Sequence, residues 1–576
     1  MFEGWITRAA NRGPVGVDSE TTGLAMYSGD TLRTVQFGDA WTGYVLPVEK
    51  SARLRALAAH WLRRLPCMVL HNASFDLQFF EEGLGVPAAE LWPRVRDTKI
   101  IAHLADPRGQ EEGGTGHGLE QLTRAHISAV VAEEVKASMG ALAREMKTTK
   151  SEVWRKVDID NPAYNLYAGM DPILAVRLYQ KLLPRVPNVS RHLINYEHDL
   201  ARVCTAMERR GFLLDVDYTQ GLSERLQQQE DEATMHAAAF FSVESVNSTR
   251  DVASAFLDLG VKIPGRTATG EYKIDKVFLD SLVTDDPEIG SPAHLAAAVQ
   301  EAKKARKWRT TWIDGFLAGA DRAGRIHPVI NPLRARTARM SITGIPAQTL
   351  PSGDWIVRRC FIADPGETVI AVDYKAQELR VLAALSGDPT MQHAFANDLD
   401  LHQITADAAG VVRPVGKMAN FLTVYGGQAD ALALQASVPR PTAVRTLKAF
   451  GETYPGVIAY SKKRQADARR DGYITTATGR VLPVDRSRAY SALNYDVQST
   501  SRDVTCRGLL ALDKAGLTEY LRLPVHDEVV ASVPTHQAEE AKRAIAQLMR
   551  MELRGVLIDT DAETAGASWG HKYMKG

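Results

Sequence analysis

Four acidic residues in the first third of the sequence have the spacing of ligands for divalent metal ions. The segment VDSETTG follows a Gly-Pro break, so we expect a buried strand whose alternating side chains place Asp18 and Glu20 on one side. Asp76 stands at the start of a predicted helix, after the segment NASF. Tyr167 and Asp171 are four residues apart and therefore share one face of a helix. The pattern predicts one centre of four carboxylates with a tyrosine beside it.

Such a centre suits the hydrolysis of a phosphodiester. Carboxylate oxygens are hard ligands that fit Mg²⁺ or Mn²⁺. Two such ions, about 3.5–4 Å apart, can generate a hydroxide and stabilise the leaving oxygen, and Tyr167 could orient the attacking water. Any one of these carboxylates alone is more often a solvated surface charge, so the ordered set carries the prediction. Asp97, in the segment RDT, is expected to have a structural role instead.

A second group of carboxylates stands in the C-terminal half. Asp373 follows the apolar run from Thr368 to Val372, a predicted central strand, and Asp527 and Glu528 occupy the tip of a predicted hairpin, PVHDEVV. Two buried carboxylates repel each other unless a cation lies between them. A divalent ion bridging Asp373 and Asp527 would also lower the pKa of a primer 3′-hydroxyl and neutralise a triphosphate. Taken alone, the HDE segment could equally be a polar hairpin turn.

A helix between these segments carries a face suited to a nucleotide. Arg413, Lys417, Phe421 and Tyr425 recur every four residues and are followed by two glycines. All four lie on one broad face of an α-helix. The cations suit phosphate oxygens, and the aromatic rings suit stacking near a base or sugar. The alternative is an ordinary amphipathic helix with its aromatic residues in the core and its cations extended to solvent.

Together these segments resemble two known families. Asp373, Tyr374, Gln377 and Glu378 match the first catalytic motif of the family A DNA polymerases, the DNA polymerase I family. The predicted helix from Arg413 to Gly426 matches the second motif, and the HDE segment matches the third. The N-terminal set resembles the DEDD 3′–5′ proofreading exonucleases in their tyrosine variant. The resemblance covers nearly the whole chain, with the motifs in the right order.

The resemblance implies roles for individual residues. Glu378 would be the steric gate that disfavours a ribose 2′-hydroxyl, and Lys417 the general acid for pyrophosphate. The ring of Phe421 would pack beside the nucleotide sugar, and Tyr425 would lie beside the templating position. The expected dNTP-binding residues are Gln377, Glu378, His402, Arg413, Lys417, Phe421 and Tyr425. The expected catalytic residues are Asp373, Asp527, Lys417, Asp18, Glu20, Asp76, Tyr167 and Asp171.

The resemblance also implies two Mg²⁺ or Mn²⁺ ions at each site. The expected ligands are Asp373, Tyr374, Asp527 and Glu528 in the polymerase and Asp18, Glu20, Asp76 and Asp171 in the exonuclease. Primer-template contacts are expected from Arg339, Gln348, Asn494, Gln498 and His526. Three departures from the family pattern bear on these contacts. Tyr490 replaces a usual arginine, and Thr349 replaces a usual asparagine. The segment from Ser499 to Ser501 follows Gln498 where the family favours Gly-Thr-Ala.

A basic segment surrounds Trp308 and comprises Lys303, Lys304, Arg306 and Lys307. It can be a solvated helix face or a thumb that grips phosphates, and its place in the chain favours the thumb. The chain as a whole has 69 basic and 69 acidic residues, so overall charge does not indicate nucleic-acid binding and any DNA site must be a local patch. The four cysteines lie far apart and are expected to be reduced thiols in a cytoplasm, that of the host cell if the protein is phage-encoded.

Length, 576 residues, and ordinary globular composition predict several α/β domains with no membrane span. We expect an RNase H-like exonuclease domain over residues 1–188 and a right-hand polymerase domain over 189–576. The thumb is expected at about 200–325, the palm at about 326–385 and 485–576, and the fingers at about 386–484. The chain has intact exonuclease motifs, and we expect no segment before Asp18 that could hold a 5′-nuclease domain. In both respects it resembles bacteriophage replicative polymerases.

The expected function is template-directed DNA synthesis with 3′–5′ proofreading. The expected partners are primer-template DNA, dNTPs and replisome proteins such as a helicase and a single-strand-binding protein. We expect a monomer, without a processivity subunit of the thioredoxin type because no long insertion interrupts the thumb. Two alternatives are an exonuclease whose C-terminal half grips DNA without polymerising, and a non-catalytic nucleic-acid-binding scaffold. Primer extension with dNTPs separates the first alternative from a polymerase.

Overall fold

The computed structural model describes residues 1–350 and 355–574. The chain forms two compact units, which are described separately. The first contains Met1–Gly211, Pro328–Thr343 and Pro365–Thr564, and the second contains Phe212–His327, Gly344–Asp364 and the chain from Ala565 onward. Helices and β-sheets occur in both units, which confirms the α/β class. No described helix is both long and apolar enough to cross a membrane.

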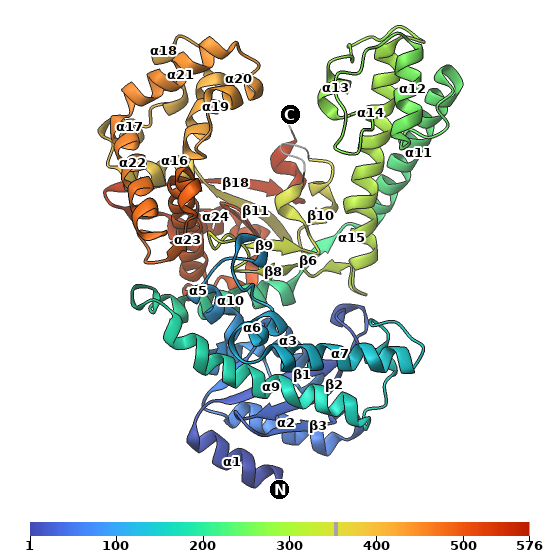
Figure 1. The fold of residues 1–576 in the computed structure, drawn as a ribbon, viewed down its shortest axis with the longest axis vertical. Helices are drawn as coiled ribbons and strands as arrows, with labels where there is room; N and C mark the ends of the chain where they lie inside the picture. The colour runs from blue at the N-terminus through green and yellow to red at the C-terminus, as the bar shows by residue number, and fades with distance from the viewer. Residues whose placement is uncertain (351–354, 575–576) are drawn as a thin grey trace. The chain divides into compact units, whose positions relative to one another are not determined.

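The N-terminal part of the first unit is built on a five-stranded sheet of order β3-β2-β1-β4-β5 (Figure 1). The pairs β1–β2 and β2–β3 are antiparallel, whereas β1–β4 and β4–β5 are parallel. The strands, from β1 to β5, are Val15–Thr21, Leu32–Gly38, Gly43–Leu46, Met68–Leu70 and Val95–Asp97. The strand predicted for the segment VDSETTG is confirmed as β1.

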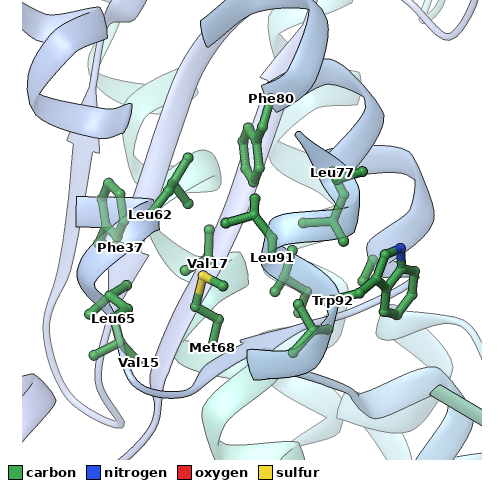
Figure 2. Close-up of a cluster of buried hydrophobic side chains, with 14 of the residues drawn as sticks. Val15, Val17, Phe37, Leu62, Leu65, Met68, Leu77, Phe80, Leu91 and Trp92 are labelled. Carbon is green, nitrogen blue, oxygen red and sulfur yellow. The ribbon is translucent and has the colours of Figure 1, made fainter. Parts of the chain in front are cut away.

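Helices cover both faces of this sheet. Met68 and Leu70 join a large apolar core on one face, shown in Figure 2, whereas Val69 packs with Ala175 and Val176 on the other. This division follows from the alternation of side chains along a strand. The helices of this part are α1 (Phe2–Arg12), α2 (Ala52–Arg64), α3 (Ala73–Leu84), α4 (Ala88–Leu91), α5 (Thr98–Ala105), α6 (Leu119–His126), α7 (Ala129–Glu145), α8 (Val153–Lys156) and α9 (Pro162–Leu182).

Helix α10 (Leu193–Arg210) ends before Gly211. Its Glu197 is fully buried and forms ion pairs with Arg480 and Arg502. Asp503 is also buried and pairs with the same two arginines, at 2.7 and 2.9 Å. This four-residue cluster joins α10 to α23 (Ala492–Lys514) and to the hairpin β12–β13 (Tyr473–Thr475 and Val481–Pro483).

The C-terminal part of the first unit contains a four-stranded sheet of order β14-β15-β11-β18. Strand β11 is antiparallel to β15, which is antiparallel to β14. The residues from Val369 to Val372 are fully buried, which confirms the predicted central strand. Helix α24 packs against β11. The elements are β14 (Leu521–Val525), β15 (Glu528–Pro534), β11 (Glu367–Tyr374), β18 (Thr560–Gly566) and α24 (Ala538–Met549).

A group of helices, α16 to α22, follows β11 (Figure 1) and precedes the hairpin β12–β13 in the chain. Of these, α19 confirms the helix predicted from Arg413. The helices are α16 (Gln377–Ser386), α17 (Pro389–Ala396), α18 (Leu401–Ala409), α19 (Arg413–Val424), α20 (Ala429–Gln435), α21 (Arg440–Thr453) and α22 (Pro455–Asp471). The small strand pairs β8–β9 (Val329–Asn331, Ser341–Thr343) and β16–β17 (Met551–Leu553, Val556–Ile558) complete the unit.

The second unit is mostly helical. Long helices α11 and α14 pack together around an apolar cluster, and a three-stranded sheet of order β10-β6-β7 lies in the same unit. Its elements are α11 (Val216–Phe241), α12 (Thr249–Asp258), α13 (Lys276–Asp280), α14 (Pro292–Trp308), α15 (Asp314–Gly319), β6 (Phe212–Leu214), β7 (Arg325–Ile326) and β10 (Phe361–Ile362).

Candidate active sites

Three of the four predicted N-terminal carboxylates meet at one place. Asp18 and Glu20 project from β1, and Asp171 projects from α9. One ligand oxygen of each lies within 4.8 Å of the others, and no other group of three or more such residues in the described ranges meets that distance. The chemistry of this donor set fits a divalent cation, because every donor is a carboxylate oxygen.

Close packing of α9 on the sheet brings these carboxylates together. A Cβ atom on Gly16 of β1 would lie 2.1 Å from the carbonyl oxygen of Pro172, and one on Gly43 of β3 would lie 2.2 Å from that of Gly169. Only glycine permits this approach. Side chains two residues apart on a strand share a face, so Asp18 faces the same helix as Gly16.

Asp76 lies beside this group but is not one of the three. The hydroxyl of Ser19 donates a hydrogen bond to Asp76 Oδ1 at 2.6 Å and so fixes the carboxylate at the start of α3. Burial, and then the negative charge of Asp76, raises the pKa of Asp18 well above its ordinary value. Burial also raises the pKa of Asp76 and of Asp171 to about 7. The metal-free cluster is therefore electrostatically unfavourable when ionised, and a divalent cation would relieve the repulsion.

Tyr167 lies one helical turn before Asp171 and hydrogen-bonds to its carboxylate. The charge of Asp171, together with burial, raises the pKa of the Tyr167 phenol, which keeps it a proton donor. The ring also stands edge-on to Trp154, with 5.3 Å between centroids. A cavity of about 260 Å³ opens beside Tyr167 and Asp171, with mostly apolar walls that include Met139 and Val153.

Asp97 has the structural role expected for it. Its carboxylate accepts hydrogen bonds from the backbone N–H groups of Asn72, Ala73 and Lys99, at 2.8–3.0 Å. It therefore caps α5 and also fixes the N-terminal end of α3, one turn before Asp76.

The C-terminal carboxylates lie at the end of β11 and at the start of β15. Asp373 is paired directly with Glu528 in the antiparallel register of β11 and β15. Asp527 lies in the hairpin tip, and its carbonyl oxygen accepts a hydrogen bond from the Tyr374 N–H at 3.2 Å. Burial, followed by the charges of Asp373 and Glu528, raises the pKa of Asp527 to about 6. This is again a donor set that a divalent cation would stabilise.

The side chain of Tyr374 points into the core, where its hydroxyl donates to the carbonyl oxygen of Met549 at 2.7 Å. Any metal ligand from Tyr374 is therefore its backbone carbonyl oxygen. Gln377 is also turned inward and donates to the Thr505 hydroxyl at 2.8 Å. His526, at the hairpin tip, has a φ of 57°, which is rare for a residue other than glycine.

Glu378 is held by two other residues of the predicted site. It forms an ion pair with Arg339. It also accepts a hydrogen bond from the Tyr425 hydroxyl at 2.9 Å. These contacts bring together residues predicted separately to bind nucleotide and primer. These contacts could not be predicted from the sequence, because they join three segments that are distant along the chain.

The predicted nucleotide face of α19 is present and largely exposed. Arg413 and Lys417 are exposed and Phe421 is half-buried. Arg413 pairs with Asp400 at 2.6 Å, a contact that the sequence did not reveal. The ring of His402 lies 5.7 Å from that of Phe421 and hydrogen-bonds to Asn420 at 3.0 Å. Burial lowers the pKa of His402 and so favours the neutral ring.

The predicted DNA contacts are distributed over both units. In the first, Gln498 on α23 accepts a hydrogen bond from Thr337 at 3.4 Å, and the side-chain oxygen of Asn494 is buried without a hydrogen-bond partner among the described residues. In the second, Lys304, Arg306 and Lys307 of α14 are exposed and Lys303 is half-buried. Gln348 lies in the second unit, in a short 3₁₀ turn.

The fold and the two carboxylate centres define a nucleic-acid polymerase joined to a nuclease. Residues 216–571 match the family model described as DNA polymerase family A, and residues 1–187 match the one described as 3′-5′ exonuclease. The chain therefore belongs to DNA polymerase family A and carries an N-terminal 3′–5′ exonuclease domain. The expected polymerase with 3′–5′ exonuclease function is confirmed, and the alternative of a non-polymerising C-terminal half is not favoured.

Similar proteins include polymerases of phages. The DNA polymerase of Mycobacterium phage L5 is 53% identical over 97% of this chain and 93% of its own length. That of Mycobacterium phage D29 is 49% identical over 98% and 94%. DNA polymerase I of Pseudomonas aeruginosa is 26% identical over 95% of this chain and 62% of its own length. The solved POL domain of Pol1 from M. smegmatis, in complex with DNA primer-template and dNTP, has the same fold, with a TM-score of 0.77 and 22% identity over 99% of this chain and 98% of its own.

Proposed function

We propose that this chain extends a primer 3′-hydroxyl with dNTPs at Asp373 and Asp527, and removes misincorporated 3′ ends at Asp18, Glu20 and Asp171. The observation that supports it best is the pairing of Asp373 with Glu528 at adjacent strand ends, with Asp527 beside them. Carboxylates so placed would be unfavourable in a purely structural role. The biological context we propose is replication of bacteriophage DNA.

Two Mg²⁺ or Mn²⁺ ions are proposed at each centre. In the polymerase they would be held by the carboxylates of Asp373 and Asp527, with Glu528 and the Tyr374 carbonyl oxygen as further ligands. In the exonuclease they would be held by Asp18, Glu20, Asp76 and Asp171. Bound divalent ions activate the attacking oxygen and stabilise the leaving oxygen in phosphoryl transfer.

The protein's own groups would bind and orient the nucleotide. Arg413 and Lys417 are exposed on one face of α19, where they can contact triphosphate oxygens. Lys417 would protonate the departing pyrophosphate. Phe421 would pack against the sugar, and Glu378 would exclude a ribose 2′-hydroxyl. Gln377 and His402 would support this pocket, Gln377 through its buried bond to Thr505.

At the exonuclease centre, Tyr167 would orient the attacking water, since its phenol stays protonated beside Asp171. The mostly apolar cavity lined by Met139 and Val153 would take the base of the terminal nucleotide, because a flat apolar group suits such walls. Asp76 would act as a ligand after a small movement toward Asp18.

Primer-template DNA would be gripped through its phosphates. The proposed contacts are Arg339, Gln348, Asn494, Gln498, His526, Lys303, Lys304, Arg306 and Lys307. We retain the proposed domain limits, with the exonuclease at 1–188 and thumb, palm and fingers within 189–576. We also propose a monomer that works in the host cytoplasm with a replicative helicase and a single-strand-binding protein.

Primer extension tests this proposal. A labelled primer-template is incubated with the protein, Mg²⁺ and four dNTPs, with and without an unlabelled DNA trap. We expect extension to the end of the template, and we expect shortening of the same primer when dNTPs are left out. No extension by a protein that still shortens the primer would refute the proposed synthesis.

A further inference from the structure

A short turn between β8 and β9, residues 334–339, contacts both domains of the first unit. Within it, Arg334 and Ala335 each donate a backbone hydrogen bond to the carbonyl oxygen of Arg339, at 3.2 Å. Ala338 has a φ of 63°, an unfavourable conformation for a residue other than glycine. A turn with this strain requires support from its surroundings.

Arg336 supplies much of that support. Its Nε atom lies 3.1 Å from Glu112 Oε1, an ion pair without the alignment of a hydrogen bond. Its Nη1 donates to the carbonyl oxygen of Pro483 at 3.3 Å, and the guanidinium lies 5.5 Å from the centroid of the Tyr495 ring. The Arg336 side chain is 12% exposed. One side chain thus ties the turn to the exonuclease loop that holds Glu112 and to helix α23.

A second contact comes from the exonuclease side. His103 on α5 donates a hydrogen bond from Nε2 to the carbonyl oxygen of Ala335, at 2.9 Å. Burial lowers the pKa of His103 well below its ordinary value, so the ring is neutral and acts as an uncharged donor. The exonuclease domain therefore holds the turn at two consecutive residues, Ala335 and Arg336.

The other end of the turn reaches the polymerase site. Arg339 pairs with Glu378, which also accepts the hydrogen bond from Tyr425 at 2.9 Å. A movement of the turn would carry Arg339 with it, because the backbone carbonyl of Arg339 is bonded to both Arg334 and Ala335. Glu378 would then lose one of its two supports.

We propose that Arg336 is a positioning residue for sugar selection: through Glu112, the exonuclease domain holds the turn that presents Arg339 to Glu378. This rests on the proposed role of Glu378 at the nucleotide sugar. The exonuclease domain is thus a structural part of the polymerase site as well as an editing nuclease. Disturbing the Glu112–Arg336 pair loosens Glu378 and admits ribonucleotides more readily.

The alternative use of Arg336 is direct contact with DNA. A polar cavity of about 540 Å³ is lined by three arginines, Arg108, Arg336 and Arg488, and by three acidic residues, Glu111, Glu112 and Asp485. Its acidic residues offset its arginines, which does not favour a phosphate. The two uses predict different kinetics, because a phosphate contact acts on DNA affinity equally for deoxynucleotides and ribonucleotides.

The experiment compares kcat/KM for a dNTP and the matching rNTP in Glu112→Gln, Arg336→Gln and the charge-swapped pair Glu112→Arg with Arg336→Glu. We expect each single variant to lower the ratio of kcat/KM for the dNTP to that for the rNTP about three- to fivefold, because a partly exposed ion pair contributes a free energy of that size. The charge-swapped pair should recover part of the loss. Digestion of single-stranded DNA should be unchanged. Glu111→Gln is the matched control, because Glu111 is exposed, lines the same cavity and forms no ion pair with any residue in the described ranges.

A further arm places Arg336→Gln in a Glu378→Ala background. Because Arg336 acts through Glu378, the Arg336→Gln substitution should not lower the dNTP-to-rNTP ratio of kcat/KM any further in the Glu378→Ala background. An unchanged ratio in the single variants with weaker DNA binding would overturn the proposal in favour of phosphate contact. An equal fall of this ratio on Arg336→Gln in the wild-type and Glu378→Ala backgrounds would also overturn the proposal. If Arg336→Gln does not fold, Glu112→Gln on the surface loop carries the test. Failure of the wild-type protein to extend primers would instead refute the proposed function.

Discussion

The hydroxyl of Tyr425 donates a hydrogen bond to Glu378 at 2.9 Å, joining the end of α19 to the first turn of α16. Arg339 pairs with the same carboxylate. The residue proposed to exclude a ribose 2′-hydroxyl is therefore fixed by two partners from separate segments. Selection of the sugar depends on how well they hold the carboxylate in place.

Removing the tyrosine hydroxyl should weaken this selection. In Tyr425→Phe we expect the ratio of kcat/KM for a dNTP to that for its rNTP to fall about fivefold, because an exposed hydrogen bond to a charged group contributes roughly 1 kcal/mol. Tyr473→Phe, on the exposed strand β12, is the control and should leave the ratio unchanged. Equal discrimination in Tyr425→Phe and wild type would contradict this role for the hydroxyl.

The sequence predicted the members of this arrangement but not their contacts. Spacing placed Tyr425 on the nucleotide face of α19, and motif resemblance selected Glu378 and Arg339. The contacts among the three residues depend on how α19, α16 and the 334–339 turn pack together. Local spacing in the sequence contains no information on packing between distant segments. The pairing of Asp400 with Arg413 was not predicted, for the same reason.

The exonuclease cluster should make stability depend on pH when metal is absent. Folding raises the pKa of Asp171 from 3.8 to about 7, so the folded protein binds the proton more tightly than the unfolded chain. The free energy of unfolding therefore falls as pH rises from about 4 to 7. In chelator at pH 8 we expect Asp171→Asn to be more stable than wild type by about 1–3 kcal/mol, and the gain to vanish near pH 4.

Thermal unfolding at the two pH values, with and without Mg²⁺, measures this effect. Mg²⁺ should stabilise wild type more than Asp171→Asn. Asp160→Asn removes an exposed carboxylate just before α9 that pairs with exposed Lys50, and it should differ from wild type by less than about 1 kcal/mol at both pH values. A variant less stable than wild type at pH 8 in chelator would show that the cluster is not under electrostatic strain.

Asp97, by contrast, is expected to contribute to stability and not to metal binding, because its carboxylate accepts hydrogen bonds from backbone N–H groups. Asp97→Ala removes the acceptor for three N–H groups, on Asn72, Ala73 and Lys99. We expect the free energy of unfolding to fall by about 2–4 kcal/mol, at roughly 1 kcal/mol per bond. The Mg²⁺ concentration needed for half-maximal digestion should not change at a temperature where the variant is folded. A raised Mg²⁺ requirement with unchanged stability would make Asp97 a ligand.

The buried cluster at α10 should be costly to break. Glu197→Gln leaves Arg480 and Arg502 partly uncompensated, so we expect a loss of about 3–5 kcal/mol at pH 7 by urea unfolding. The arginines offset the effect of burial and lower the pKa of Asp503 to about 2, and that of Glu197 is lowered as well. Their stabilisation is therefore present above about pH 4 and is lost as pH falls toward 2. A Gln variant as stable as wild type at pH 7 would contradict this.

The secondary structure around both sites followed from the sequence, because strands with alternating or continuous apolar residues and the helix at Arg413 have strong local periodicity. The buried cluster at α10 could not be predicted from the sequence, because ionisable residues carry no periodic signal and the partners are distant along the chain. Its members are Glu197, Arg480, Arg502 and Asp503. The hydrogen bond from Ser19 to Asp76 was likewise not predicted, although Ser19 lies within the segment VDSETTG.

Synthesis and editing are proposed to occur at two separate carboxylate centres. The direct measurement follows one labelled primer-template with Mg²⁺, with and without dNTPs, in Asp373→Asn and in Asp18→Ala with Glu20→Ala. We predict that Asp373→Asn abolishes extension and retains digestion, and that the double variant retains extension and abolishes digestion. Loss of both activities in either folded variant, or continued extension in Asp373→Asn, would contradict the account.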